Sequence, residues 1–537
     1  MAKYIFITGG VVSSLGKGIA SASIGKLLEW SGYKVAIIKC DPYINVDPGT
    51  MNPYQHGEVY VTDDGAETDL DLGHYYRYTN SPLSRLSNVT TGKVYQNVIT
   101  KERRGDFLGG TVQVIPHITG EIKEEIRKVG KKYNIDIILV EIGGTVGDIE
   151  SLPFLEAIRQ MKNELGAGNA INIHLTLMPY IKSAGELKTK PTQHSVGKLR
   201  EIGIQPEILM VRTEKPLEAG ARSKISLFCN VHEDCVIEAR DVDDIYEIPL
   251  MFRKNGLDKI ILEKLHLKKE KDGATKKWER LVRISKTAKS AVRVGVVGKY
   301  ITLQDAYKSI DEALKHGAIT NGKKLDLVKI EADSLEEKSE GEIKKVFDGI
   351  SGVLVPGGFG GRGINGKLIA TRYARESGTP YFGICLGMQI AVIEFARNVC
   401  GMKGANSTEF NPRTRFPVIS LLSEQKEIKW MGGTMRLGHY KCKLKKGTLA
   451  RKIYASSEVM ERHRHRYEFN SFFKKKFQAR GMVFSGTHPK GNLVEIVEIK
   501  DHPWFLAVQF HPEFKSKPDK AHPLFRGFVK AACEYSS

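Results

Sequence analysis

The sequence lacks any long apolar run and has few cysteines. No uninterrupted apolar stretch reaches the roughly 18 residues that a membrane-spanning helix needs, so we expect no membrane partner. The 7 cysteines are scattered over 537 residues without paired metal-ligand spacing. In a chain of this length they predict the reduced thiols of a cytoplasmic protein, and they argue against a disulfide framework.

Acidic residues are in the minority, with 62 Asp and Glu against 82 Lys and Arg, which gives a net charge of +20 at pH 7. A basic balance of this size raises the question of a nucleic-acid partner. The lysines are spread along the chain, several beside acidic residues, and the sequence has no helix-turn-helix or RNA-binding signature. We therefore expect a solvated basic surface that attracts small polyanions such as nucleoside triphosphates, and no nucleic-acid partner.

A chain of 537 residues is too long for one hydrophobic core, and its composition changes at one place. Residues 266–290 are polar and lysine-rich, which is typical of an exposed linker, with one short amphipathic helix around residues 278–284. On both sides of this linker, apolar runs such as "IDIILVEI" and "SGVLV" alternate with helical segments. Such runs predict parallel sheets covered on both faces, so we expect two tandem α/β domains at residues 1–265 and 291–537.

The first stretch that indicates chemistry is "TGGVVSSLGKGIA", residues 8–20, between a short apolar run and a helical pattern. A strand, a glycine-rich turn and a helix N-terminus can together hold phosphate through backbone N–H groups. The stretch departs from the usual phosphate-binding loop in two ways. Five residues separate Gly10 from Gly16, and Gly18 replaces the hydroxyl residue expected after Lys17. We interpret it as a nucleotide-binding loop; a glycine turn without a nucleotide is the alternative.

Carboxylates later in the sequence are candidates to replace the missing hydroxyl. Five of them lie between residues 61 and 77, in "VTDDGAETDLDLGHYYR", and Asp71 is one of these. Glu141 stands at the C-terminal end of a buried apolar run, where the ligand crevice of an α/β sheet opens. Mg²⁺ binds a few carboxylates plus phosphate oxygens, so we expect Asp71 and Glu141 to be its ligands. A solvated loop is the alternative for part of the acidic stretch.

A second anion site is indicated by "ELKTKPTQHS", residues 186–195. We expect Lys188 and Lys190 to project from the same side of an extended segment, with Pro191 blocking helix continuation. Two lysines beside Thr and Gln suit the phosphates and base edge of a nucleotide. A solvated lysine pair is the alternative.

The second half of the chain contains a nucleophile elbow in "TPYFGICLGMQIAV". Gly383 and Gly387 bracket Cys385 as G-x-C-x-G, in which a sharp turn from strand to helix exposes the nucleophile. The positive end of the following helix favours the thiolate. Farther on, "AVQFHPEF" places His511 and Glu513 two residues apart, so the imidazole can act as the base and the carboxylate can orient it.

The glycine-rich turn "PGGFGGRG", residues 356–363, follows another apolar run and offers free backbone N–H groups. The N–H groups of Gly358 and Leu386 are candidates for an oxyanion hole, which stabilises the charge that develops during acyl transfer.

At these residues the chain resembles the CTP synthase family over nearly its whole length. Its first half resembles the synthetase part in "GGVVSSLGKGI", "KCDPYINVDPGTM", "DGAETDLDLGHY", "EIGGTVGDIES" and "KTKPTQHS". Its second half resembles a class I glutamine amidotransferase in "PGGFGGRG", "GICLGMQ", "NSTEF", "ERHRHRYE" and "FHPE". The resemblance implies a P-loop-like amidoligase domain followed by a glutamine amidotransferase domain, and it implies that the altered loop is normal for the family.

The resemblance also implies a reaction. ATP phosphorylates O4 of the UTP ring, ammonia displaces that phosphate, and the products are CTP, ADP and phosphate. The ammonia comes from L-glutamine through a thioester of Cys385, or from solution. The resemblance further implies a ligase of pyrimidine biosynthesis with Mg²⁺ as cofactor, GTP as allosteric activator, CTP as feedback inhibitor, and a homotetramer.

The site residues are carried over from the family motif by motif. The residues expected to bind ATP are Ser14, Leu15, Gly16, Lys17, Gly18, Ile19, Lys39, Asp71 and Val242. Those expected at UTP or at the inhibitor CTP are Ser13, Asp148, Ile149, Glu150, Lys188, Thr189, Lys190, Pro191, Thr192, Gln193 and Lys224. The expected glutamine pocket comprises Gly358, Leu386, Gly387, Met388, Gln389, Glu409 and Arg466. The catalytic residues are Cys385, His511 and Glu513, and the Mg²⁺ ligands are Asp71 and Glu141.

Two alternative functions remain open from the sequence. Another ATP-dependent amidoligase fused to a glutaminase, such as the enzymes that amidate cobyrinic acid, acts on carboxylates, and "KTKPTQHS" and "EIGGTVGDIES" are not expected in it. A nucleotide-switched assembly protein, such as a partition-type ATPase that uses a basic surface on DNA, has no use for the elbow cysteine. Release of glutamate from glutamine separates this second alternative from an enzyme.

Overall fold

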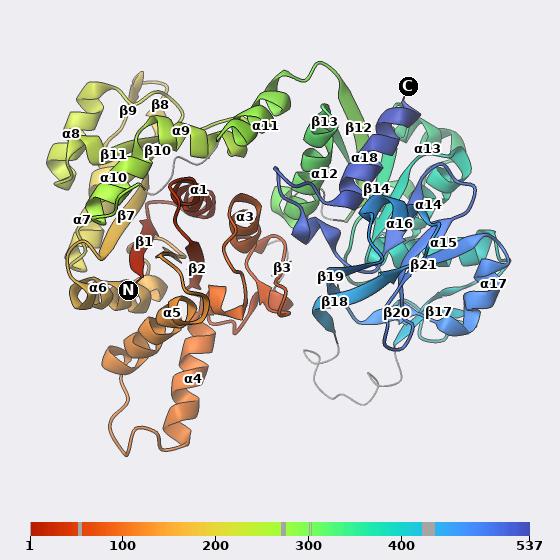
Figure 1. Cartoon of the computed structure of the whole chain (residues 1–537), viewed down its shortest axis with the longest axis horizontal. Coiled ribbons are helices and arrows are strands. Elements are labelled where there is room, and N and C mark those ends of the chain that lie inside the picture. The colour runs from red at the N-terminus through yellow and green to blue at the C-terminus, as the bar shows by residue number, and fades with distance from the viewer. Residues whose placement is uncertain are drawn as a thin grey trace. The chain divides into compact units, whose positions relative to one another are not determined.

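The computed structural model describes residues 2–51, 56–269, 275–299, 301, 303–421 and 435–536. These residues form two compact units of the mixed α/β class (Figure 1). The first unit comprises Met1–Thr50 and Asp71–Val282, and the second comprises Met51–Leu70 and Arg283–Ser537. The acidic segment before Asp71 therefore packs with the second half of the chain. The predicted first domain, residues 1–265, includes this segment.

A seven-stranded sheet forms the centre of the first unit, and all its strand pairs are parallel. The strand order is β11-β10-β7-β1-β6-β2-β5. The strands are β1 (Lys3–Gly9), β2 (Val35–Asp41), β5 (Asn88–Thr90), β6 (Ile137–Ile142), β7 (Ala170–Leu177), β10 (Ile208–Thr213) and β11 (Val236–Arg240). The central strands are almost entirely buried, as in parallel sheets covered by helices on both faces, so the predicted parallel sheet is confirmed here.

Ten helices of the first unit surround this sheet in the described part of the chain. They are α1 (Lys17–Trp30), α3 (Asp71–Tyr78), α4 (Thr91–Arg103), α5 (Thr119–Tyr133), α6 (Leu152–Leu165), α7 (Lys190–Glu201), α8 (Ala219–Cys229), α9 (Ile248–Lys254), α10 (Leu257–Lys264) and α11 (Lys276–Thr287). α5 and α6 pack on one face, where Phe6, Ile126 and Ile158 share a buried cluster. A short hairpin of β8 (Tyr180–Ile181) and β9 (Glu186–Leu187) precedes α7.

Helix α11 lies inside the segment that the sequence predicts as a linker. Its Trp278 is buried and donates through Nε1 to the carbonyl oxygen of Tyr246 at 2.7 Å. The predicted short amphipathic helix is therefore present, and its start packs on the first unit. No helix in the described residue ranges is long and apolar enough to cross a membrane.

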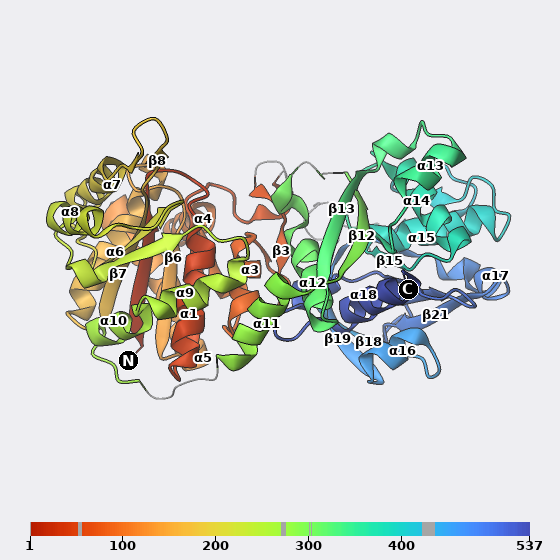
Figure 2. The same cartoon turned by 90° about the horizontal axis from the view of Figure 1, so that it is seen from above.

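Parallel pairing brings several predicted synthetase residues to one edge of the first sheet. β1 pairs with β6 so that Ile7 faces Glu141, and β2 pairs with β6 so that Lys39 faces Glu141. The glycine-rich loop begins where β1 ends, and these strands all run in one direction. Lys39, Glu141 and the loop therefore meet at the carboxyl edge, where ligands bind in open α/β sheets. The strands can be followed from above in Figure 2.

The second unit contains a nine-stranded sheet of order β13-β12-β14-β15-β23-β22-β21-β18-β19. Its strands are β12 (Ala291–Gly298), β13 (Lys324–Glu331), β14 (Gly352–Val355), β15 (Tyr381–Ile384), β18 (Arg436–Leu444), β19 (Glu458–His465), β21 (Met482–Thr487), β22 (Val494–Ile499) and β23 (Phe505–Val508). Pairing is parallel from β13 to β23, as predicted, and antiparallel from β23 to β19. The sequence analysis did not predict the antiparallel extension.

The remaining elements of the second unit are helices and two small sheets. The helices are α12 (Lys308–Thr320), α13 (Glu340–Val346), α14 (Ile364–Ser377), α15 (Leu386–Asn398), α16 (Leu449–Tyr454), α17 (Lys474–Gln478) and α18 (Pro523–Tyr535). One small sheet is formed by β16 (Asn406–Ser407), β17 (Pro417–Leu421) and β20 (Tyr467–Phe469). The other is a hairpin of β3 (Tyr60–Val61) and β4 (Glu67–Thr68).

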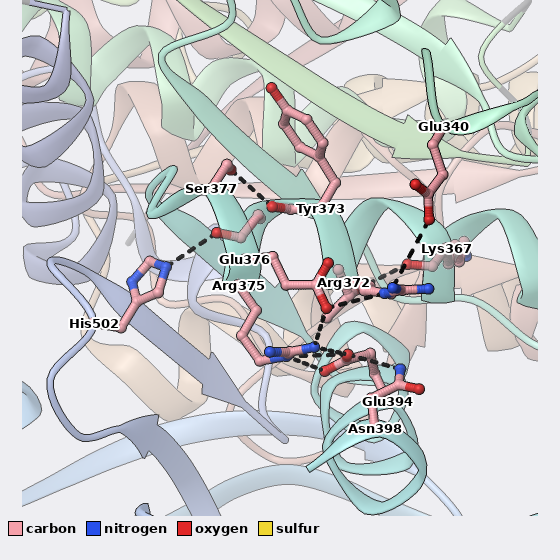
Figure 3. A network of polar contacts seen from close by, with 12 residues as sticks. Glu340, Lys367, Arg372, Tyr373, Arg375, Glu376, Ser377, Glu394, Asn398 and His502 are labelled. Atoms are coloured by element: carbon pink, nitrogen blue, oxygen red, sulfur yellow. Dashed lines mark hydrogen bonds and ion pairs between the residues drawn. The ribbon is translucent and has the colours of Figure 1, made fainter. Parts of the chain in front are cut away.

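A buried ion pair fixes α15, the helix that follows the elbow cysteine, against α14 (Figure 3). Arg375 donates to both carboxylate oxygens of Glu394, through Nε at 3.0 and 2.9 Å and through Nη2 to Oε1 at 2.8 Å. Glu394 is only 1% exposed, and Asn398 donates to it at 2.9 Å. A charge buried this deeply needs its partner, so the pair determines how the two helices pack.

We expect Arg375→Met to lower the apparent free energy of unfolding by about 3–5 kcal/mol, because it leaves the Glu394 carboxylate buried and uncompensated. The matched control is Arg372→Met on the same helix, whose partner Glu376 has a half-exposed side chain. Loss of that surface pair should cost about 0–1 kcal/mol. Urea titration followed by circular dichroism measures both variants, and equal midpoints would contradict the account.

Candidate functional site

The glycine-rich loop has the context that the sequence predicts, since it joins β1 directly to α1. Helix α1 begins at Lys17, and Gly16 precedes it with φ +94°, a left-handed conformation that favours glycine. Lys17 Nζ donates to the carbonyl oxygen of Gly144 at 2.8 Å. Burial, followed by repulsion from Lys39, lowers the pKa of Lys17. The loop therefore places a cation and a helix N-terminus at one point, as a phosphate site requires.

Beside the loop, Lys39 is held between the two predicted metal ligands. Its Nζ donates to Asp71 Oδ2 and, at 2.9 Å, to Glu141 Oε1. Glu141 is fully buried, and its other oxygen accepts from Ser21 Oγ at 2.8 Å and from the Tyr75 hydroxyl at 2.6 Å. The two carboxylates therefore converge on one positive charge next to the phosphate loop.

Gly18, the residue that breaks the usual loop pattern, lies against Asp71. A Cβ atom at position 18 would lie 1.9 Å from Asp71 Oδ1, far closer than any side chain can approach. Asp71 thus occupies the space into which a Ser or Thr at this position would project. The altered loop and the carboxylate are two parts of one arrangement, which is why the loop carries no hydroxyl.

A cavity of about 300 Å³ opens next to the loop. Among its lining residues are Leu15, Gly16, Ile19 and Val242, all of them predicted at ATP. Arg212 also lines it, donating to the carbonyl of Ser14 at 3.0 Å and to Asp241 at 2.8 Å. The sequence analysis missed Arg212 because nothing near it in the sequence forms a motif.

A larger cavity, of about 600 Å³, lies between the β8–β9 hairpin and α8. The predicted nucleotide residues that line it are Lys188, Thr189, Lys190, Gln193 and Lys224. Lys215 adds a further positive charge that the sequence analysis did not identify. The cavity therefore offers several cations to one anionic ligand.

The predicted conformation of this segment is wrong after Thr189. Helix α7 begins at Lys190, with Pro191 in its first turn, rather than ending there. Proline is compatible with this position because the first N–H groups of a helix have no partner within it. Thr192 is buried, and its hydroxyl forms a hydrogen bond with that of Thr176, so its side chain faces the core and not the cavity.

Four other predicted nucleotide residues lie outside this cavity. Ser13 is an exposed residue of the glycine-rich loop. Asp148, Ile149 and Glu150 follow β6, where Asp148 accepts from the backbone N–H of Thr145 at 3.0 Å. Ile149 is 74% exposed, which is unusual for a side chain of this type.

The predicted elbow is present between β15 and α15. Cys385 has φ +52°, a strained value for a residue with a side chain, and its backbone N–H donates to the carbonyl of Val508 at 2.7 Å. A Cβ atom at Gly387 would lie 2.0 Å from the Val355 carbonyl, and one at Gly383 would lie 2.7 Å from Gly387. Both glycines of the motif are therefore required by the tight packing of the turn.

The three predicted catalytic residues come together. His511 Nδ1 lies 2.7 Å from Glu513 Oε1, so the carboxylate orients the ring. A Cβ atom at Gly357 would lie 2.9 Å from His511 Cε1 and 3.5 Å from Cys385 Cβ, so both side chains contact the same glycine. His511 Nε2 is buried and has no hydrogen bond within the described part of the chain, which leaves it available for a proton from Cys385.

The environment of His511 favours its charged form. Burial alone would lower the pKa of His511, but the interactions with Glu513 and Cys385 outweigh it and raise the pKa to about 10. The ring therefore carries its proton at neutral pH. Cys385 Sγ also donates to the Arg464 carbonyl and accepts from Gln509 Nε2, each at 3.8 Å.

The predicted glutamine residues surround this thiol on several elements. Gln389, on α15, donates to the Tyr467 carbonyl at 3.2 Å, and Leu386, Gly387 and Met388 are buried in the first turn of the same helix. Glu409 accepts from the N–H of Gly360 at 3.0 Å and is close enough to Arg466 for their charges to interact. Gly358 lies beside Leu386, as an oxyanion hole made by their N–H groups requires.

Two lysines that the sequence analysis missed lie near the glycine-rich turn of this unit. Lys299 Nζ donates to the carbonyls of Phe359 and Gly360, at 2.7 and 2.5 Å. Lys367 is fully buried near Gly358, and burial lowers its pKa to about 7. Neither lysine stands in a recognisable motif, so only the fold reveals them.

Known families match both units. "CTP synthase N-terminus" matches residues 3–267, and "Glutamine amidotransferase class-I" matches residues 302–531. The CTP synthase of Bacillus subtilis is 57% identical over 535 residues, which cover 99% of this chain and 99% of that protein. The CTP synthase of Clostridium acetobutylicum is 59% identical over 99% of this chain and 98% of that protein. That of Aquifex aeolicus is 58% identical over 100% of this chain and 99% of that protein.

Phosphate chemistry in one unit and thiol chemistry in the other define a class: ligases that activate an acceptor with ATP and take nitrogen from glutamine. Sequence identity to CTP synthases over the whole length of the chain narrows this class to one family. The chain belongs to the CTP synthase family, which confirms the resemblance seen in the sequence. It is accordingly a glutamine-hydrolysing ligase that aminates UTP to CTP, and the two alternative functions are not favoured.

We expect Gly18→Ala to reduce ammonia-dependent CTP formation by about a hundredfold, because the new Cβ displaces Asp71, and a misplacement of about 1 Å has effects of this size. The matched control is Gly120→Ala in α5, where a Cβ meets nothing within 4 Å. The initial rate at saturating ATP measures both variants. A Gly18→Ala rate within twofold of the control would contradict the proposed packing of loop and carboxylate.

We expect Glu513→Gln to shift the alkaline limit of glutamine hydrolysis to lower pH. Glu513 raises the pKa of His511, so removing its charge lowers that pKa below about 10 and deprotonates the ring earlier as the pH rises. Glutamate release between pH 7 and 11 measures the shift. The ammonia-dependent rate of the same variant serves as control, and an unmoved or raised alkaline limit would contradict the assignment.

Proposed function

We propose that the chain aminates UTP in two steps, with ATP phosphorylating O4 of the ring and ammonia then displacing the phosphate. One observation carries the proposal: the loop that begins α1 is built around Asp71 and two lysines, whereas a complete cysteine site occupies the other unit. The carbonyl oxygen of a pyrimidine ring is a poor leaving group until it is phosphorylated. An enzyme that aminates it therefore needs both sites.

ATP is proposed to bind with its phosphates on the loop and its adenine in the 300 Å³ cavity beside Val242. The backbone N–H groups from Ser14 to Ile19 orient the phosphates, and Lys17 and Lys39 offset their charge. The apolar residues Ile245, Met251 and Phe252 add flat contact area for a base.

The residues present fit Mg²⁺, which we propose to be held by Asp71 and Glu141. Both carboxylates already converge on a cation, the ammonium of Lys39. Mg²⁺ takes a few carboxylates and completes its coordination with phosphate and water oxygens. When bound, the ion neutralises charge during phosphoryl transfer.

UTP is proposed to bind in the 600 Å³ cavity. The four lysines that line it, Lys188, Lys190, Lys215 and Lys224, suit a triphosphate, and Thr189 and Gln193 offer hydrogen bonds. Ser13, on the phosphate loop, remains a candidate contact for the same substrate.

At the cysteine site, Cys385 Sγ is proposed to attack the side-chain amide of glutamine. As the Sγ–C bond forms and the amide C–N bond breaks, the proton that Cys385 has given to His511 Nε2 passes to the departing nitrogen, which leaves as ammonia. Glu513 holds the imidazolium, and the N–H groups of Gly358 and Leu386 stabilise the oxyanion. Water hydrolyses the thioester to glutamate, while Arg466, Glu409 and Gln389 hold the substrate.

Regulation and assembly complete the proposal. GTP is proposed as activator and CTP as feedback inhibitor, with Asp148, Ile149 and Glu150 at the CTP site. A homotetramer is proposed because the family to which the chain belongs implies it. A reducing, cytoplasmic location is proposed because all seven cysteines are free and six of them are buried.

We expect Cys385→Ala to abolish glutamine-dependent CTP synthesis and to leave ammonia-dependent synthesis within about twofold of the wild type. The reason is that Cys385 touches only the glutamine chemistry. CTP formation from UTP and ATP, measured with glutamine and separately with ammonium, tests whether glutamine hydrolysis and UTP amination occur at separate sites. The proposed function would be wrong if the folded variant lost both activities, or if the unmodified chain failed to convert UTP with either nitrogen source.

A further inference from the structure

The acidic segment that precedes Asp71 belongs to the second unit and not to the nucleotide-binding unit. It folds into the hairpin of β3 and β4, in which Tyr60 pairs with Thr68 and Val61 with Glu67. Its contacts are with β18 and β19 and with the residues that follow the catalytic histidine. The sequence analysis considered the segment only as a source of metal ligands or as a solvated loop.

Two carboxylates of this hairpin pair with two arginines of β19. Arg462 Nε donates to Asp63 Oδ1 at 2.5 Å, and Arg464 Nε donates to Glu67 Oε1 at 2.7 Å. The Arg462 side chain is only 2% exposed, whereas that of Asp63 is 50% exposed, so the pair brings a half-exposed carboxylate to a buried cation. The contacts with His439 and Arg462 outweigh burial and hold the pKa of Asp63 below its usual range.

The tip of the hairpin packs on β18 without room for side chains. A Cβ atom at Gly65 would lie 2.9 Å from the Leu437 carbonyl, and one at Gly438 would lie 2.6 Å from the N of Gly65. The N–H of His439 donates to the carbonyl of Asp63 at 2.9 Å. This backbone contact fixes the register of the hairpin on the sheet, which places each carboxylate opposite its arginine.

The same two arginines contact the catalytic residues through their backbone. β19 is the edge strand of its sheet, and the carbonyls of Arg462 and Arg464 accept from the N–H of His511 at 2.7 Å and from Cys385 Sγ at 3.8 Å. One edge strand therefore contacts the nucleophile and the base. A shift of this strand would displace both.

Side-chain contacts of the arginines extend to the rest of the site. Arg462 Nη1 donates to the carbonyl of Phe514, the residue after Glu513, at 3.0 Å, and to the Tyr60 hydroxyl at 2.6 Å. That hydroxyl donates to the same carbonyl at 2.8 Å. Arg464 lies over the ring of Phe359 at 4.9 Å, beside Gly358. The pairs with Asp63 and Glu67 thus hold two arginines that contact Phe514 and Phe359 through their side chains and His511 and Cys385 through their backbone.

We propose that Asp63 and Glu67 are positioning residues for the glutaminase reaction. They act through Arg462 and Arg464 and touch neither the glutamine nor the reacting sulfur. Without these charges each guanidinium group loses its carboxylate partner, and β19 relaxes away from the geometry that aligns Cys385 with His511. A glutaminase domain cut out as residues 291–537 lacks this support. The inference rests on the proposed reaction at Cys385.

The test compares Asp63→Asn, Glu67→Gln and the double variant in the full chain with the wild type. We expect kcat for glutamate release to fall about tenfold or more in the double variant, because alignment of nucleophile and base is lost, while KM for glutamine changes less than about twofold. Ammonia-dependent CTP synthesis should stay within about twofold. The matched control is Glu458→Gln, which removes an acid on β19 that pairs with Lys441 and not with a catalytic contact.

A double-mutant cycle separates positioning from a general loss of stability. If Glu67 acts through Arg464, Glu67→Gln combined with Arg464→Met should be no slower in glutamate release than the slower single variant. The proposal is overturned if the double carboxylate variant hydrolyses glutamine at the wild-type kcat. It is also overturned if the two effects in the cycle multiply, or if ammonia-dependent synthesis falls as far as glutamine hydrolysis. Absence of CTP synthesis in the wild type would instead overturn the proposed function.

A thermal melt of each variant shows that the chain is folded. Glu67→Asp, which keeps the negative charge, should restore part of the rate of glutamate release.

Discussion

Glu141, a completely buried carboxylate on strand β6 of the first sheet, is the constraint on which the first unit depends. It is stable there only because Lys39, Ser21 and Tyr75 donate to it. Lys39 in turn attracts Asp71, and Asp71 leaves no room for a side chain at Gly18. The unusual phosphate loop is therefore a consequence of where the acids are, and the loop and its cation site form one arrangement.

The acidic stretch between residues 61 and 77 serves two chemistries within a short length of chain. Asp71 accepts from Lys39 beside the glycine-rich loop, whereas Asp63 and Glu67 accept from Arg462 and Arg464 of β19. The second unit thus includes a segment, Met51–Leu70, that precedes most of the first unit in the sequence. This division suits an enzyme that must release ammonia from one site for use at another.

Local signals in the sequence predicted much of the molecule. The apolar runs predicted the parallel strands. The stretch "GICLG" predicted the elbow because a side chain on either glycine would collide with the turn itself or with the adjacent strand. Features that depend on distant partners were missed: the pair of Asp63 with Arg462 joins residues 399 apart, and Arg212, Lys299 and Lys367 stand in no motif. The error at Pro191 arose because proline is compatible with both the end and the first turn of a helix.

The central claim is that the first unit activates UTP by phosphorylating it, so that ammonia meets a good leaving group. The most direct measurement uses UTP labelled with ¹⁸O at O4, with ATP, Mg²⁺ and ammonium, and follows the label by mass spectrometry of the released phosphate. The account predicts one ¹⁸O atom in the phosphate for every CTP formed, because the ring oxygen departs bonded to phosphorus. Unlabelled phosphate, with the ¹⁸O released into water while CTP accumulates, would contradict it.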